Sequence, residues 1–286
     1  TRRSSDLQDD SKGFVEDSSF DVLNKNFFLH RDFRNNGAGN GGSADDQNYR
    51  QEWAHGITAL YESGYTVGTV GFGVDAHGML GIKLDSSPDR TGTGLLPTHD
   101  NGYAADEYSK LGLTGKVKVS QTELKIGTLI PELPTLQPND GRILPQTFEG
   151  GLLTSKEIKG LTFTGGRLDK AKDRNDTNWE DLALNNKNGR FVGGATGKHF
   201  NFGGVDYKFA EKVTGSYHFA QLDDVYRQHF LGLVAARPMG PGTFGTDLRL
   251  VPLQQVPCGR YQADGGVIDM LDFGDGAHAR LHEGAV

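Results

Sequence analysis

The chain has 286 residues, of which 35% are hydrophobic and 23% charged, with a formal net charge of −7 and one cysteine. The negative charge and the lack of a basic cluster argue against a nucleic-acid partner, and one cysteine allows no disulfide framework. No run of about 18 apolar residues occurs, so a transmembrane helix is excluded, whereas strands that show only alternate residues to lipid remain compatible with this composition.

The first 13 residues are polar and are predicted to form a tail. The chain begins Thr1-Arg2-Arg3, without Met and without an apolar segment, which indicates either a removed signal peptide or a fragment. The first strands are predicted at 20–34 and 50–65. Between them, the Gly/Asn/Asp-rich stretch at 35–48 has the composition of a loop.

The strongest pattern lies between residues 69 and 85, where almost every second residue is apolar. Val70, Phe72 and Val74 share one parity, while Asp75 and Lys83 share the other. Successive strand side chains point to opposite faces, so this is one strand with an apolar face and a charged face. Strands of globular proteins average about 5–6 residues, and this one is far longer. The pattern is typical of a transmembrane β-barrel, although a soluble sandwich can also alternate.

Long loops and pairs of strands joined by tight turns alternate along the chain. A long polar loop at 85–107 precedes two strands, 110–120 and 122–130, that are joined by a tight turn. Long loops at one end and short turns at the other are the layout of outer-membrane barrels. Further strands are predicted at 148–158, 161–168, 199–210, 213–221 and 224–237, with another long polar loop at 169–198.

Residues 131–147 contain four prolines, which excludes a central strand. The segment is too apolar for an external loop. Leu133, Leu136, Ile143 and Leu144 require a surface to pack against. We expect this loop to fold into the interior of the barrel.

Sequence signatures of catalysis are missing. No Ser lies in a G-x-S-x-G context, and no H-E-x-x-H, phosphate-binding glycine loop or Cys/His ligand set occurs. Asp223 and Asp224 are adjacent, so in a strand their carboxylates would point to opposite faces. The sequence therefore predicts no enzyme, no catalytic or metal-binding residues and no cofactor.

Basic residues opposite the apolar faces are the better functional signal. On a soluble sheet they would be a solvated face, whereas inside a barrel a row of cations selects anions. The predicted solute-binding residues, a ladder along the pore, are Lys25, Lys116, Lys118, Lys125, Arg142 and Arg227. Arg142 lies on the Pro-rich loop, where it either contacts substrate or closes the loop by bonding carbonyls.

Several long segments together make the chain similar to the OprD-type outer-membrane porins of pseudomonads. The matching stretches are G-F-V-E-D-S at 13–18, Y-E-S-G-Y-T-V-G-T-V-G-F-G-V-D-A at 61–76, L-G-I-K-L-D-S-S-P-D-R-T-G-T-G at 80–94, Y-S-K-L-G-L-T-G-K-V-K-V-S at 108–120, L-K-I-G-T-L-I-P at 124–131, G-R-I-L-P-Q-T-F at 141–148 and D-D-V-Y-R-Q-H-F-L at 223–231.

This resemblance implies an all-β fold, an antiparallel transmembrane barrel of roughly 18 strands in the family, of which this chain carries about the first ten. It further implies location in the outer membrane, contact with its lipid, a loop folded into the pore and facilitated diffusion of small carboxylates along basic residues. The sequence of residues 124–148 is more similar to the branch of the family that takes aromatic and other organic acids than to the branch that takes basic amino acids. The resemblance also allows a homotrimer as the assembly of full-length members of the family.

The resemblance stops near residue 249. Beyond it, Pro252, Pro257 and Cys258 stand where another lipid-facing strand is expected. We therefore predict a partial barrel over 14–249 and an aberrant tail at 250–286, frameshifted or recombined. Such a half sheet leaves two unpaired edges, which lipid does not tolerate. The alternatives are a non-functional truncated porin, or a soluble all-β carbohydrate-binding protein whose aromatic rings stack on sugars.

Overall fold

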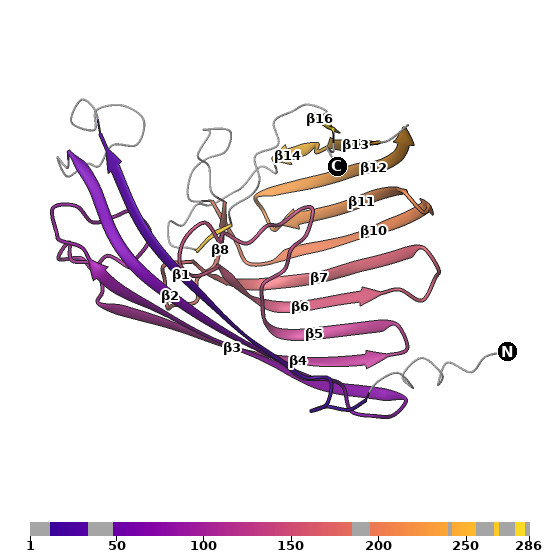
Figure 1. The fold of residues 1–286 in the computed structure, drawn as a ribbon, viewed down its shortest axis with the longest axis horizontal. Helices are drawn as coiled ribbons and strands as arrows, with labels where there is room; N and C mark the ends of the chain where they lie inside the picture. The colour runs from indigo at the N-terminus through magenta and orange to yellow at the C-terminus, as the bar shows by residue number, and fades with distance from the viewer. Residues whose placement is uncertain are drawn as a thin grey trace.

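The chain folds into one long antiparallel sheet in which consecutive strands lie side by side (Figure 1). The structure is a computed structural model, and it describes residues 12–33, 48–184, 195–239, 242–255, 266–268 and 278–283. These residues contain no helix long and apolar enough to span a membrane. The predicted tail up to residue 11, the predicted loop at 35–47 and most of 250–286 lie outside the described residues.

Within the described residues the main sheet has 13 strands, and its order follows the chain apart from the short β14, which pairs with β12. Its strands are β1 (Ser19–Asp32), β2 (Tyr49–Glu62), β3 (Val70–Asp85), β4 (Glu107–Val119), β5 (Thr122–Leu129), β6 (Thr147–Ser155), β7 (Leu161–Lys172), β10 (Phe200–Ala210), β11 (Val213–Leu222), β12 (Tyr226–Met239), β13 (Gly242–Leu250), β14 (Leu253–Gln255) and β16 (His278–Glu283). A small second sheet joins β15 (Gly266–Ile268), β8 (Leu182–Leu184) and β9 (Thr196–Gly197).

Each of the ten strands predicted before residue 238 corresponds to an observed strand, β1–β7 and β10–β12. The all-β antiparallel fold class is thus confirmed. The bounds differ most at β7, which continues four residues further, to Lys172, while β2 and β6 end three residues early and β4 begins three residues early. The predicted loop at 169–198 is therefore shorter, and it contributes β8 and β9. The boundary proposed at residue 249 stays a prediction.

The two faces of the sheet differ as the alternation predicts. Phe72 pairs with Val117, while Gly73 pairs with Lys116. Directly paired residues share a face, so the apolar and basic side chains of β4 lie on opposite faces. Leu111 on this strand is 82% exposed, whereas Lys116 is buried. The predicted register is confirmed.

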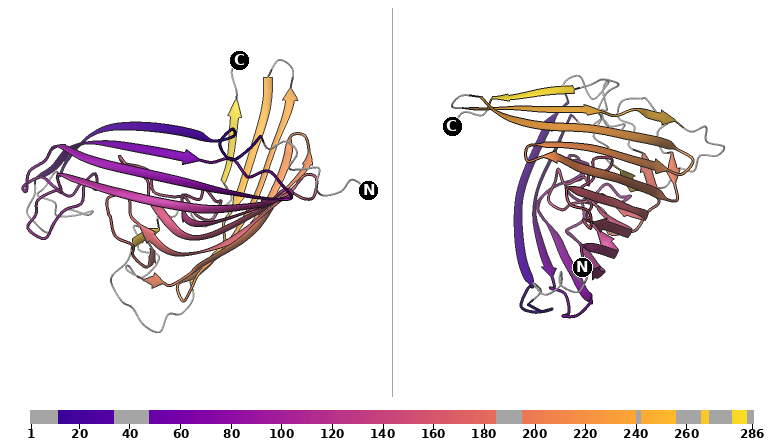
Figure 2. Two further views of the ribbon diagram at one scale, coloured as in Figure 1. Left: turned by 90° about the horizontal axis from the view of Figure 1, so that it is seen from below. Right: turned by 90° about the vertical axis from the view of Figure 1, so that its right-hand side faces the viewer.

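The sheet curves strongly (Figure 2). Exposed apolar side chains such as Phe72, Leu111 and Leu113 lie on the face opposite the buried Lys116, which is the convex outer face. The segment 131–147 lies against the concave face. Its Leu133 and Leu136 join a buried cluster with Phe148 and Phe200, and its Ile143 and Leu144 are fully buried in a second cluster. These contacts are of the kind expected for a loop folded inward, and its role as a constriction stays a prediction. Prolines remove backbone donors, so the loop cannot pair as a strand and is held by side-chain burial instead.

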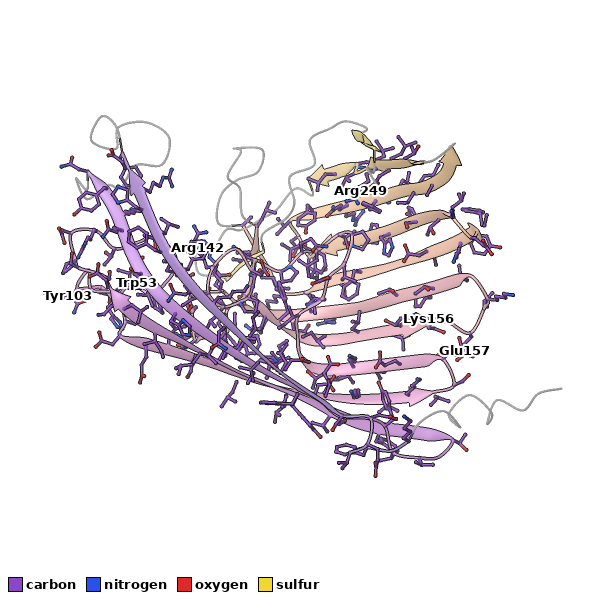
Figure 3. All side chains as sticks on the ribbon, in the orientation of Figure 1. Trp53, Tyr103, Arg142, Lys156, Glu157 and Arg249 are labelled. Atoms are coloured by element: carbon purple, nitrogen blue, oxygen red, sulfur yellow. The ribbon has the colours of Figure 1, made fainter. Side chains whose placement is uncertain are left out.

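Two short turns are tied together by one carboxylate, Glu157, between β6 and β7 (Figure 3). It accepts hydrogen bonds from the Ser120 hydroxyl at 2.9 Å, the Gln121 amide at 2.8 Å and the Thr122 hydroxyl at 3.0 Å. The Ser120 hydroxyl and the Gln121 amide hold the pKa of Glu157 below its usual value. The bonds stabilise the left-handed backbone of Ser120, whose φ is 55°.

We expect Glu157→Gln to lower the urea midpoint of unfolding at neutral pH. A pKa lowered by folding means that the ionised carboxylate stabilises the folded state. That contribution is complete above the usual glutamate pKa and is lost as the pH falls through the lowered value. The difference between Glu157→Gln and the unsubstituted chain should therefore shrink in acid. Glu211→Gln, at an exposed position in the β10–β11 turn, is the control, and an equal effect of both would refute the role of Glu157.

Candidate functional site on the concave face

Three of the predicted basic residues gather on neighbouring strands at the short-turn end of the inner wall. Lys116 of β4 and Lys125 of β5 are direct register partners. Lys116 Nζ lies 2.5 Å from Asp75 Oδ1 and 2.7 Å from the Ser63 carbonyl oxygen, while Lys125 Nζ is 3.5 Å from Asp75 Oδ2. One carboxylate from β3 thus partly neutralises two ammonium groups.

An aromatic ring completes this group. The Tyr65 ring centroid lies 5.0 Å from Lys116 Nζ and 5.4 Å from Lys118 Nζ, within the range of cation–π attraction. The Tyr65 hydroxyl donates to the Glu123 carboxylate. Tyr65 comes from the β2–β3 connection, so a turn holds the cations of β4 in place. Together, Lys116, Lys118 and Lys125 with Asp75 and Tyr65 form what we call the lower basic group.

A hollow of about 320 Å³ opens beside the lower basic group. It is lined by Asp75, His77, Thr114, Lys125 and Thr128 and, from the inward loop, by Pro131. Its walls combine one ammonium group, hydroxyls and apolar surface, a mixture suited to a small organic anion. Within the described residues, no group of three or more His, Cys, Asp and Glu side chains could hold a metal ion.

Two of the three remaining predicted cations, Arg142 and Lys25, lie at the inward loop. Arg142 donates from Nε and Nη2 to the Thr93 carbonyl at 3.3 and 3.4 Å and from Nη1 to the Gly141 carbonyl at 2.8 Å. Its guanidinium lies 5.8 Å from the centre of the Phe27 ring, next to β1 and β2 (Figure 3). Lys25 Nζ is 3.5 Å from Asp140 Oδ2.

Arg142 therefore has a structural role in binding the loop at 85–107, which was the alternative to substrate contact. Its guanidinium has five N–H groups, and these three bonds leave two for a solute. Burial, and the nearby guanidinium of Arg174, lower the pKa of Arg142. An arginine starts so far above neutrality that the group stays a cation.

Arg227 does not belong to this set. It shares its strand parity with Leu231 and Leu233, both exposed, whereas Tyr226 and Gln228 are buried on the concave side. Its register partner on β11 is Gln221, on the same outer face. The prediction that Arg227 points into the lumen is wrong, because both parities of β12 carry apolar residues and pairing with β11 decides the face.

Several residues that shape the pathway were not among the predicted site residues. Glu52 is fully buried and accepts from the Thr93 amide at 2.9 Å, which holds the loop that in turn binds Arg142. Lys110 is also buried, and its Nζ donates to the Pro145 carbonyl at 3.0 Å and to the carbonyl of Asp173. The sequence already places Glu52 and Lys110 on the polar faces of their strands. It does not reveal their bonding partners, which lie far away along the chain.

An apolar convex face, short turns opposite long loops and an inward loop beside a row of cations define a β-barrel channel of the outer membrane. The chain belongs to the OprD family of outer membrane porins, whose sequence model matches residues 12–267. This confirms the family expected from the sequence and the outer membrane as its location. The family consists of channels rather than enzymes, and the soluble carbohydrate-binding alternative is wrong.

Curated relatives come from pseudomonads. The chain is 38% identical over 244 residues to Porin-like protein GalP of Pseudomonas putida, covering 85% of this chain and 56% of GalP. It is 39% identical over 226 residues to Porin D of Pseudomonas aeruginosa, covering 78% of this chain and 47% of Porin D. The chain thus spans about half the length of the curated relatives it matches.

Solved structures show the same fold. OpdG (OccK9) of P. aeruginosa superposes with a TM-score of 0.78 at 45% identity, covering 85% of this chain and 60% of OpdG. A BenF-like porin from Pseudomonas fluorescens Pf-5 gives 0.77 at 37% identity, covering 87% and 61%. P. aeruginosa OpdK, solved with vanillate, gives 0.75 at 37% identity, covering 87% and 60%.

Proposed function

We propose that the protein carrying this chain passes small carboxylates, aromatic or other organic acids, across the outer membrane by facilitated diffusion. The observation that carries this proposal is the row of cations on the concave face, from the lower basic group to Lys25 and Arg142 at the inward loop. The vanillate bound to OpdK, an aromatic carboxylate on a relative of the same fold, supports the choice of solute.

The carboxylates paired with these cations favour passage of an anionic solute over its tight binding. Asp75 and Asp140 each lie beside a lysine of the pathway, so a carboxylate competes with a resident partner at these two positions. Conduction needs sites that attract a solute and release it again. Several weak sites in a narrow, low-dielectric path still focus the potential and raise the local concentration of anions.

The proposal is tested by swelling of liposomes that contain the protein carrying this chain, with vanillate as the solute. We expect Arg142→Gln to slow vanillate entry about tenfold, since a hydrogen bond to a charged group contributes about 1.5 kcal/mol. The outer-face variant Arg227→Gln removes the same charge and should leave entry unchanged. Entry of a neutral sugar should respond to neither. Equal vanillate rates for Arg142→Gln and the unsubstituted protein would overturn the role of Arg142.

A second measurement tests the solute class itself. Swelling rates for vanillate, for its uncharged alcohol analogue and for a basic amino acid are compared in the same liposomes. The proposal expects the carboxylate to enter faster than both other solutes. Entry of the basic amino acid at the higher rate would overturn the carboxylate preference, and no swelling with any solute would favour the non-functional alternative.

A further inference from the structure

On the convex face, four polar side chains form one row near the long-loop ends of neighbouring strands. Arg167 of β7 pairs with Asn201 of β10, Asn201 pairs with Gln221 of β11, and Gln221 pairs with Arg227 of β12. Directly paired residues share a face. This is the outer face, because Arg227 shares its strand parity with the exposed Leu231. We call these four residues the polar row.

Aromatic and apolar side chains follow the polar row toward the short turns. The next row on the same face holds Gly165, Gly203, Phe219 and His229, and the row after it holds Phe163, Val205, Tyr217 and Leu231. The Phe219 and His229 rings lie 5.1 Å apart, and the Tyr217 hydroxyl is 3.0 Å from His229 Nδ1. Such rings are typical of the level where hydrocarbon meets head groups. The polar row therefore lies at head-group level on the side of the long loops, which is the extracellular side.

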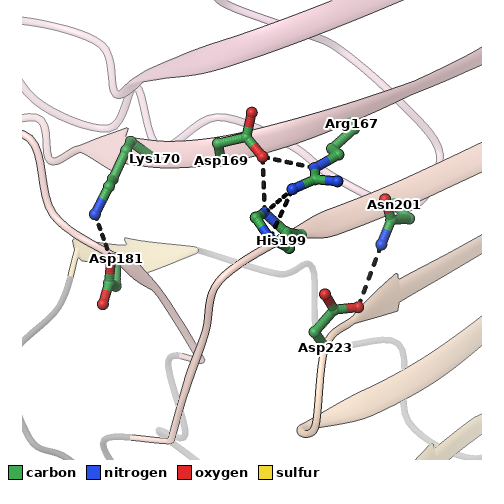
Figure 4. Close-up of polar contacts among 7 residues, drawn as sticks. All are labelled: Arg167, Asp169, Lys170, Asp181, His199, Asn201 and Asp223. Atoms are coloured by element: carbon green, nitrogen blue, oxygen red, sulfur yellow. Dashed lines mark hydrogen bonds and ion pairs between the residues drawn. The ribbon is translucent and has the colours of Figure 1, made fainter.

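A guanidinium group stands at each end of the polar row. Arg167 Nε donates to Asp169 Oδ1 at 2.7 Å, and its Nη2 contacts the His199 ring (Figure 4). These contacts orient Arg167 and leave the two N–H groups of Nη1, while the side chain is 51% exposed. Arg227 at the other end is exposed as well. Between them, Asn201 Nδ2 donates to Asp223 Oδ1 at 3.2 Å, which leaves the Asn201 amide oxygen as an acceptor (Figure 4).

We propose that the polar row binds the head group of a membrane glycolipid, a disaccharide that carries a phosphate at each end. One phosphate would bond to Arg167 and the other to Arg227. Sugar hydroxyls would bond to Asn201 and Gln221, and the acyl chains would extend past Phe219 toward the short turns. This inference rests on the membrane location of the family and is independent of which solute the pore passes.

Spacing and chemistry together select this head group. Neighbouring strands lie about 4.8 Å apart, so three strand spacings place the backbones of Arg167 and Arg227 about 14 Å apart. The single phosphate of a phospholipid cannot reach both guanidinium groups, whereas a disaccharide phosphorylated at both ends can. Arginine recognises phosphate through paired N–H groups, and side-chain amides bond to hydroxyls. Asp169 and Asp223 beside the row can accept hydrogen bonds from sugar hydroxyls, but they would repel an anionic head group that has none.

The test is lipid retention by the purified protein carrying this chain in detergent, measured by native mass spectrometry. Diphosphorylated lipid A, the same lipid without its phosphates, and phosphatidylglycerol are offered at equal concentration. We expect the diphosphorylated form to be retained at least about tenfold more than either other lipid, the factor that one charge-assisted hydrogen bond supplies. Gln221→Leu should lower retention of lipid A with and without phosphates, because it removes a contact to the sugar.

Charge variants locate the site. Arg167→Gln and Arg227→Gln should each lower retention of diphosphorylated lipid A about tenfold and leave retention of the dephosphorylated form unchanged. Arg249→Gln on β13 is the matched control, since Arg249 pairs with Gly232 on the strand parity of the buried Gln228, the inner face. Should Arg167→Gln fail to fold without its contact to Asp169, the exposed Arg227→Gln keeps the proposal testable. Equal retention of lipid A with and without phosphates, stronger retention of phosphatidylglycerol, or equal effects of Arg227→Gln and Arg249→Gln would each overturn the proposal.

Discussion

Replacing Lys116, Lys118 and Lys125 together by glutamine should lower or invert the anion preference of the channel formed by the protein carrying this chain. The three ammonium groups lie on one wall, where low dielectric and few counter-ions make their potentials add. We expect the ratio of anion to cation permeability to fall about tenfold at low salt, within the range that focused fields produce. The measurement is the reversal potential across a planar bilayer under a salt gradient.

The structure supplies matched controls for this result. Arg227→Gln removes one positive charge from the outer face and should leave the reversal potential unchanged. Asp75→Asn removes the carboxylate shared by Lys116 and Lys125, so it should raise anion preference. Each effect should diminish at high salt, where the screening length shortens to about 3 Å. An unchanged preference in the triple variant would show that these lysines only form a solvated face.

Substituting Gly56 by valine should release the inward loop from the wall. A Cβ on Gly56 of β2 would stand 2.6 Å from the Ile143 carbonyl oxygen and 2.8 Å from Ile143 Cβ, so the loop must move. Ile143 and Leu144 are fully buried, and loss of such packing costs about 2–5 kcal/mol. We therefore expect trypsin to cleave after Arg142 at least about tenfold faster, since opening the loop becomes easier by more than about 1.4 kcal/mol.

A second readout separates loop release from general unfolding. Single-channel conductance should rise in Gly56→Val, because the loop lies against the inner wall of the pathway. Gly115→Val on the outer face is the control, where the nearest heavy atom to a Cβ is the Ile126 carbonyl oxygen at 3.9 Å. Unchanged proteolysis and conductance in Gly56→Val would contradict the anchoring of the loop through this close approach.

The sequence by itself determined the strands and most of their faces. Between residues 70 and 85, and again between 111 and 119, one parity is largely apolar and the other polar, so a single arrangement places the apolar side chains on the outer face and the polar ones inside. Prolines with interspersed leucines likewise determined that 131–147 is neither a strand nor an outer loop. These features are local, and period-two patterning or missing backbone donors suffice to predict them.

Only the tertiary structure decided which charges meet. Lys116 and Asp75 share the predicted polar face, yet their contact depends on the register of β3 with β4. Glu52 reaches Thr93 across 41 positions, a pairing that no local pattern encodes. Arg227 was misplaced because apolar residues on both parities of β12 leave its face open, and the hydrogen-bonded register with β11 fixes it. Alternation specifies a face within one strand, whereas contacts between strands and loops depend on how the whole chain packs.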